Sequence, residues 1–196
     1  MTSVRRVVMC VATAAMIGAG AAGIAANSAL RVVDGRVAVH CPLTVGGSFQ
    51  AKTDAVTGEL SVASSLDEPV RGEVVVDLGT LETGIGLRDR HLREKYLEVQ
   101  RGPDFTMARL QEIQIAALGG STTFRGVLAL HGERKAVNGS ATITPHADGY
   151  RVEATFPVRV SDFQIPDPTY LGVGVKDEVQ VRVNFTVGRS TTAARR

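Results

Sequence analysis

Two segments near the end of the chain alternate strictly between apolar and polar residues, and this pattern limits the fold more than any other feature. The first, 150–161, carries its apolar residues at every second position: Tyr150, Val152, Ala154, Phe156, Val158 and Val160. The second, 178–187, does the same with Val179, Val181, Val183, Phe185 and Val187. Successive side chains of a strand point to opposite faces, so each segment has one dry and one wet face. Such strands are typical of antiparallel sheets rather than of strands buried between helices.

Further strand candidates cover most of the remaining chain, over 31–40, 45–51, 59–63, 70–78, 105–116, 122–131 and 136–145. Asp148-Gly149 is a tight-turn dipeptide, and 131–134 is a second turn. The segment 163–175 contains two prolines and two glycines and is expected to be a loop.

One stretch has a helical period instead. Leu92, Tyr96 and Val99 recur at i, i+4 and i+7, which predicts an amphipathic helix over about 87–100 that ends at Gly102-Pro103. About eight strands with one helix indicate a mainly β fold, either a closed antiparallel eight-stranded barrel capped by the helix or a two-sheet sandwich. Such a barrel is filled by side chains or holds one small ligand, and the sequence leaves both alternatives open.

The first residues predict export. Arg5-Arg6 precede an uncharged run over 7–26 that ends in small residues, as in a signal peptide over 1–26. The alternative is an uncleaved anchor over 7–26 that contacts the membrane. The body is then periplasmic or secreted, or else membrane-anchored. At the other end, the small and polar residues 189–196 are expected to form a disordered tail.

Charge and motifs exclude several classes of function. The chain has 22 basic residues, and without Arg5 and Arg6 the 20 that remain equal the 20 acidic ones, so no positive field for nucleic acid is expected. The four histidines are scattered singly, and no catalytic or phosphate-binding motif is present. Without the leader, Cys41 is alone; its neighbour His40 points to the opposite face of a strand, so a buried or loop cysteine is expected. We predict no enzyme, no metal and no cofactor.

Four blocks, in order, carry a resemblance: Phe49 with Thr57-Gly58-Glu59-Leu60; Thr83-Gly84, Arg88-Asp89, His91-Leu92, Tyr96, Pro103 and Phe105; 127–132 with Lys135; and Asp177-Glu178-Val179. Together they resemble the YceI-like family, over 30–188, although Ile85-Gly86-Leu87 replaces the polar residues usual before the Arg-Asp pair. That family is described as lipid- or polyisoprenoid-binding, with a lipocalin-like barrel. The resemblance implies an exported carrier that holds a polyisoprenoid or another long-chain lipid in an elongated cavity, without catalysis.

Two groups of residues are candidates for such a site. Arg88, Asp89, His91 and His131 are predicted to meet a polar head group, or alternatively to hold the helix and a turn in place by hydrogen bonds. The predicted cavity wall is Val74, Val76, Phe124, Leu128, Val152, Phe156, Val158, Val181, Val183 and Phe185. The alternative function is a cell-envelope stress or interaction protein with a packed barrel and no lipid. The oligomeric state stays open, with a homodimer as one alternative.

Overall fold

The computed structural model describes residues 29–61, 70–147, 149–167, 169–170 and 172–189. The expected signal peptide or anchor over 1–26, residues 190–196 of the expected tail and the turn residue Asp148 lie outside this part. Among the described residues, no helix combines the length and the apolar character needed to cross a membrane.

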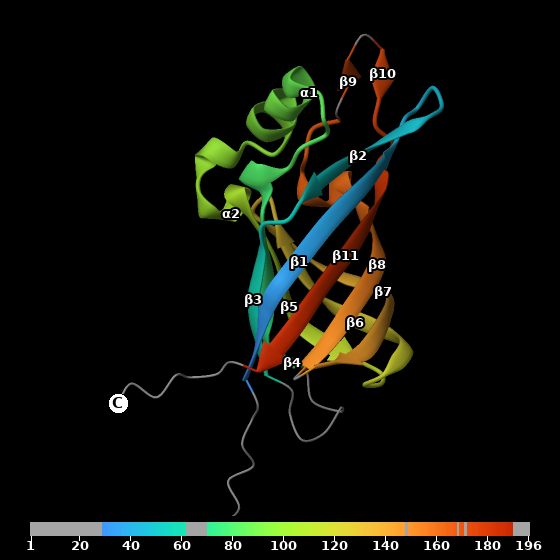
Figure 1. Ribbon diagram of the computed structural model, residues 1–196. Helices are drawn as coiled ribbons and strands as arrows, with labels where there is room; N and C mark the ends of the chain where they lie inside the picture. Colours follow the sequence, from blue (N-terminus) through green and yellow to red (C-terminus); the bar gives the residue numbers. More distant parts are fainter. Residues whose placement is uncertain (1–28, 62–69, 148, 168, 171, 190–196) are drawn as a thin grey trace, which may run out of the picture.

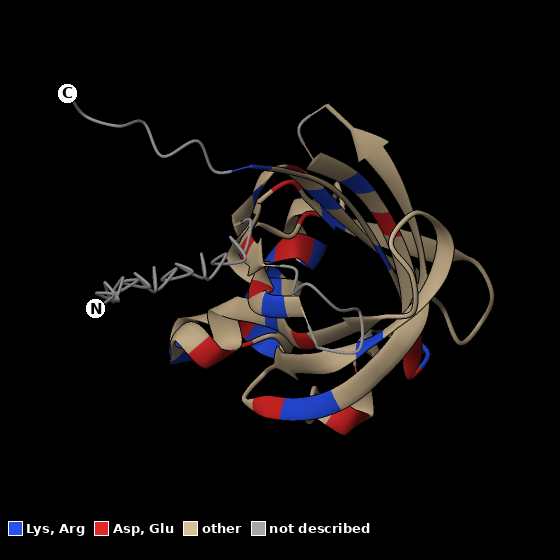
Figure 2. Cartoon of the chain, turned by 90° about the horizontal axis from the view of Figure 1, so that it is seen from below, with Lys and Arg blue, Asp and Glu red and all other residues tan. Residues whose placement is uncertain are grey.

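Antiparallel strands close into a barrel, as predicted, and seen from below they form a ring (Figures 1 and 2). The ring consists of β1 (Ala29–Pro42), β3 (Val56–Ser61), β4 (Val70–Asp77), β5 (Met107–Ile115), β6 (Gly120–Leu130), β7 (Glu133–His146), β8 (Gly149–Arg159) and β11 (Glu178–Arg189). It closes because β11 pairs with β1, from Leu30 opposite Arg189 to His40 opposite Gln180. Closure rules out the sandwich and leaves no long exposed sheet edge in the ring.

The first strand is long and has two partners along one edge. Its lower part, 29–31, pairs with β3, and its upper part, 37–42, pairs with β2 (Ser48–Thr53). The 14 residues of β1 span about 45 Å at roughly 3.3 Å per residue, so the barrel is elongated along this strand.

Irregular positions in β4 and β5 help the sheet to curl. The register of each strand with its neighbour shifts once. In β4 the shift falls at Gly72, whose φ is 104° and where a Cβ atom would lie 1.9 Å from the Glu59 carbonyl oxygen. In β5 it falls around Glu112, which has a φ of 52°. Bulges of this kind increase local twist, which closure requires.

A helix of eleven residues covers the upper end of the barrel. It consists of α1 (Gly86–His91) and a π-helical continuation, η2 (Leu92–Tyr96). It ends at Tyr96 rather than near residue 100, because Glu98 adopts a left-handed φ of 48° and breaks the hydrogen-bond ladder. Val99 therefore lies in a separate short turn, η3 (Val99–Arg101). Gly102-Pro103 begins another short helix, α2 (Pro103–Thr106), instead of ending the first.

The upper end also carries structure where a loop was expected. After η4 (Val160–Phe163), the strands β9 (Thr169–Tyr170) and β10 (Val173–Gly174) form a small hairpin within the segment 163–175. In Figure 1 this hairpin, α1 and the loop between β1 and β2 lie at the top, whereas β1 begins and β11 ends at the bottom. Buried apolar side chains fill the lower end: Leu30, Val32, Val70 and Val187.

Candidate ligand-binding cavity

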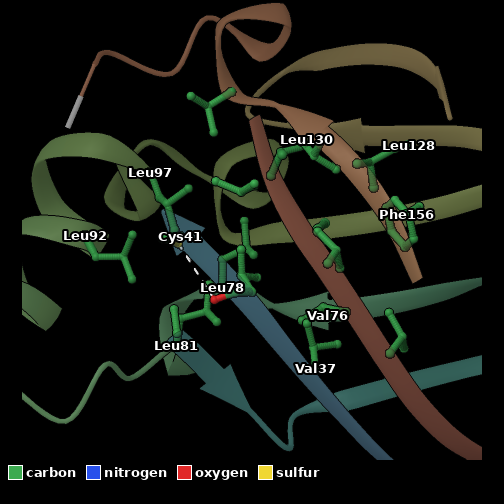
Figure 3. Close-up of a pocket in the computed structure, with 18 of the residues that line it drawn as sticks. Val37, Cys41, Val76, Leu78, Leu81, Leu92, Leu97, Leu128, Leu130 and Phe156 are labelled. Atoms are coloured by element: carbon green, nitrogen blue, oxygen red, sulfur yellow. Dashed lines mark hydrogen bonds between the residues drawn. The ribbon is translucent and has the colours of Figure 1, made fainter. Parts of the chain in front are cut away.

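The interior of the barrel is hollow. A cavity of about 690 Å³ is lined by side chains from seven of the barrel strands, from β2 and from the helix above them. In Figure 3, Val37, Leu128 and Phe156 of the strands and Leu92 of the helix surround this space. The volume lies within the range of sites that hold small molecules, roughly 300–1,000 Å³. Neighbouring wall residues such as Phe124 and Phe156 contact each other, but the inward side chains leave room for a ligand between them.

The structure places all ten predicted wall residues on this cavity: Val74, Val76, Phe124, Leu128, Val152, Phe156, Val158, Val181, Val183 and Phe185. Sequence reasoning missed the contribution of β5, because the shift at Glu112 interrupts the alternation. Leu110 and Ile113 are three residues apart, and yet both line the cavity.

Polar lining residues gather at the upper end of an otherwise apolar wall. Thr83, Arg88 and His91 come from α1 and the segment before it. Thr169 of β9 also lines the cavity, and its carbonyl oxygen accepts a hydrogen bond from the Tyr96 hydroxyl at 3.3 Å. A ligand in this cavity would have an apolar environment along its length and polar groups at one end.

Asp89 belongs to the support of this polar end and does not line the cavity. Its buried carboxylate accepts hydrogen bonds from the Thr83 backbone N–H, at 2.6 Å, and from the Thr83 hydroxyl. Burial is the largest influence on its pKa and raises it, but the Thr83 hydrogen bonds and the charges of Arg93 and Arg88 together hold the pKa below its usual value. The ionised carboxylate thus fixes the start of α1 to the preceding segment.

Arg88 links the same network to the cavity. Its Nε donates to the Thr83 hydroxyl oxygen at 2.8 Å, and its Nη2 donates to the Thr83 carbonyl oxygen at 3.1 Å. The guanidinium carbon also lies 4.2 Å from the centre of the Phe49 ring on β2, a cation–π contact. The sequence placed Phe49 in a strand candidate and in a family block but did not predict this contact, which holds α1 against β2.

His131 does not line the cavity. With a φ of 53°, followed by Gly132 with a φ of 80°, it forms the two-residue turn between β6 and β7. Its buried Nδ1 lies 3.0 Å from the Phe163 carbonyl oxygen, and its Nε2 lies 3.4 Å from a Glu98 carboxylate oxygen. The Phe105 ring packs edge-on against it at 4.7 Å between centroids. Its position is that of a residue holding a turn in place; of the four predicted head-group residues, the structure brings only Arg88 and His91 to the cavity.

Cys41 is buried in the cavity wall at the upper part of β1 (Figure 3). Burial raises the pKa of its thiol to about 11, and the charge of Arg88 offsets this only in part. The thiol is therefore protonated at neutral pH, as expected for a buried cysteine rather than a nucleophile. Within the described part of the chain, no group of three His, Cys, Asp or Glu residues is placed to hold a metal ion.

The cavity opens to solvent beside the start of α1. Ile85 and Leu87 line it and yet are 54% and 50% exposed. Ile85 is the N-cap residue of α1, where it makes no side-chain capping hydrogen bond. A sequence signal was present here, since apolar residues occupy positions where a helix start favours polar ones. We call this opening, with the loop 43–47 and the hairpin β9–β10 around it, the mouth.

A closed antiparallel barrel with a hollow apolar interior and a helix at its mouth belongs to the class of closed β-barrels that enclose a cavity. The YceI-like domain matches residues 26–187, and the chain therefore belongs to the YceI-like family.

Two solved structures support the fold. Burkholderia cenocepacia BcnA superposes with a TM-score of 0.63 and 14% identity, over 78% of this chain and 95% of that one. A polyisoprenoid-binding domain from Saccharophagus degradans, implicated in plant cell wall breakdown, gives a TM-score of 0.61 and 13% identity, over 83% and 98%. At these identities the likeness concerns the fold alone. No curated protein matches the sequence significantly.

Proposed function

We propose that the protein is an exported carrier that holds a long-chain apolar ligand, such as a polyisoprenoid, and carries out no chemistry on it. The observation that carries the proposal is the 690 Å³ cavity, whose wall is apolar except at the mouth. The YceI-like family and the polyisoprenoid-binding description of the Saccharophagus degradans domain support the choice of ligand class. The apolar run over 7–26 supports export to the periplasm or beyond.

Apolar burial supplies the affinity in this proposal. Each buried methylene contributes about 0.8 kcal/mol, which corresponds to a roughly fourfold tighter Kd. A long chain thus binds firmly without many polar contacts, and affinity rises with chain length until the cavity is full.

We further propose that Arg88 and His91 contact the polar head of the ligand at the mouth. A guanidinium carries five N–H donors, and the contacts of Arg88 with Thr83 use two of them. An anionic or hydrogen-bond-accepting head group, such as a phosphate or a carboxylate, matches the remaining donors.

The test combines native mass spectrometry of the gently purified protein with binding of a series of isoprenols of increasing length. We expect a co-purifying lipid and a Kd that falls about fourfold for each added carbon over the short members. Ala154→Phe places a phenyl ring in the cavity, opposite Ala141 of β7, and should weaken the longest ligand at least tenfold. Glu153→Phe is the matched control, since Glu153 is exposed on the outer face of the same strand.

A protein that is empty after purification and takes up neither isoprenols nor an apolar dye would refute the carrier role and favour the envelope interaction protein. Binding that is equally tight in Ala154→Phe would show that the ligand does not occupy the cavity.

A further inference from the structure

Three segments that are distant in sequence are tied together around the mouth. The loop 43–47 is joined to β10, because Thr44 N–H donates to the Gly174 carbonyl at 2.9 Å and Gly174 N–H donates to the Thr44 hydroxyl at 3.1 Å. Tyr96 at the end of η2 is joined to β9 through Thr169. The mouth is therefore one continuous rim, at the top of Figure 1.

This rim exposes apolar side chains toward solvent. Ile85 and Leu87 are half exposed, and Val45 at the tip of the loop 43–47 is 67% exposed. They account for three of the five large apolar residues that are exposed in the described part of the chain. Apolar side chains gathered on one rim mark an interaction surface more often than scattered ones do.

Charge on the rim is confined to the helix and is positive there. The segments 43–47 and 169–174 contain no charged residue. Residues 86–96 carry four cationic side chains, Arg88, Arg90, Arg93 and Lys95, against Asp89 and Glu94. Asp89 and Arg88 both bind Thr83, and Arg93 donates to the Leu81 carbonyl oxygen, so Arg90 and Lys95 are the cations presented to solvent, beside Glu94. Beside the rim, Lys52 and Glu82 lie opposite each other in a β-bridge, Asp167 precedes the hairpin β9–β10, and Lys176 and Asp177 follow it, so charges of both signs occur there. An apolar rim next to a basic helix is complementary to an anionic phospholipid surface, where apolar groups enter the boundary and basic groups meet phosphates.

We infer that the mouth docks on the surface of an anionic phospholipid bilayer, with Val45, Ile85 and Leu87 inserted and Arg90 and Lys95 against lipid phosphates. The inference rests on the proposed function for its purpose, because a docked mouth lets an apolar ligand pass between bilayer and cavity without crossing water. The docking itself is a property of the rim and is measured independently of any ligand.

Because the chain contains no tryptophan, a single tryptophan can be introduced as a reporter either at the mouth or near the lower end of β1. Val45→Trp in the exported protein, without the apolar run 7–26 that would itself enter a bilayer, places the reporter at the mouth. Val33→Trp places it near the lower end at an equally exposed position, 66% against 67% for Val45. Each variant is mixed with phosphatidylcholine vesicles, with or without phosphatidylglycerol, and with brominated lipid as a quencher. We expect Val45→Trp to shift to the blue and to be quenched on anionic vesicles, and Val33→Trp to do neither.

The charge requirement is tested in the Val45→Trp background. Arg90→Gln with Lys95→Gln should weaken partitioning onto anionic vesicles about 30-fold, since each basic residue at such a surface contributes roughly fivefold. Arg151→Gln with Arg182→Gln, on the exposed outer wall, is the matched control and should change little.

Each contrary result overturns the inference. If neither reporter shifts or is quenched, the protein does not dock on lipid. If Val33→Trp responds, alone or as strongly as Val45→Trp, the mouth is not the docking surface. Partitioning unaffected by loss of Arg90 and Lys95 would remove the anionic bilayer as the partner. Isoprenol binding in vesicle-free solution is measured alongside, so a failure of docking is distinguished from a failure of the carrier function.

Discussion

Replacing Asp89 by asparagine distinguishes the two roles that the sequence allows for this residue, which are contact with a ligand head group and support of the helix by hydrogen bonds. In the structure the carboxylate is buried and accepts two hydrogen bonds from Thr83, close to Arg88 and Arg93. Asparagine has nearly the same shape and keeps one acceptor oxygen, but it removes the charge. The change therefore weakens the attachment of α1 without creating a cavity.

The expected cost is about 2–3 kcal/mol of unfolding free energy. Hydrogen bonds to a charged group contribute roughly 1.5–3 kcal/mol each, about twice as much as neutral ones, and two are weakened here. A negative charge in the first turn of a helix adds about 0.3–1 kcal/mol. Since the folded pKa of Asp89 lies below the unfolded value, its contribution is complete above the unfolded pKa of about 4. The contribution is lost as the pH falls through the folded pKa, so wild type and Asp89→Asn should converge in acid.

Urea unfolding followed by circular dichroism, at neutral pH and at pH values below 4, measures both effects. Glu94→Gln is the matched control, because Glu94 is exposed on the same helix, and it should cost less than about 0.5 kcal/mol. If Asp89→Asn were as stable as Glu94→Gln at neutral pH while losing ligand affinity, the carboxylate would be a head-group contact and not a support.

Other changes test the rest of the site. Arg88→Gln should weaken an isoprenyl phosphate about tenfold while hardly changing the matching hydrocarbon, measured by calorimetric titration; equal losses for both would exclude a head-group role. The Cys41 thiol should react slowly with a disulfide reagent at pH 8, faster as the pH approaches 11, and more slowly again once a ligand fills the cavity; rapid reaction at pH 8 would mean that the wall is not closed around it. Gly72→Ala should lower stability by about 2 kcal/mol or more in thermal unfolding, because a Cβ atom there meets the Glu59 carbonyl; an unchanged Tm would contradict the tight approach of β3 and β4.

Much of the fold could be predicted because its strongest signals are local. The alternation along β8 and β11 is a property of each strand alone, and it identifies the inward residues, such as Phe156 and Val183, without knowledge of the partners. The helix could be located for a similar reason, because its apolar period of about 3.6 residues is also a local pattern. The end of the helix could not be predicted, because Glu98 adopts a left-handed conformation that is uncommon for glutamate.

The remaining features depend on contacts that are distant in sequence. The hollow interior is set by the radius of the whole ring, so no single strand could distinguish a cavity from a packed core. The hairpin β9–β10 lies in a segment rich in proline and glycine, and its place is fixed by Thr44 and Tyr96. The sequence could identify Arg88 and Asp89 as neighbours, but not that one faces the cavity and the other faces Thr83.

The division of β1 between two partners has a consequence for how the barrel could open. In the lower part of the barrel, β1 pairs with β3 through sheet hydrogen bonds. In the upper part, β1 pairs with β2 instead, and β2 is joined to the segment before α1 and to α1 itself by only a few contacts. These are the hydroxyl contact between Thr53 and Thr80, the backbone β-bridge between Lys52 and Glu82, and the stacking of Arg88 on Phe49. Parting these few contacts leaves the ladder of the barrel intact. If the protein is the carrier proposed above, the upper end is therefore where the wall would part most easily to admit a ligand, whereas the lower ring would limit the width of the hydrocarbon tail.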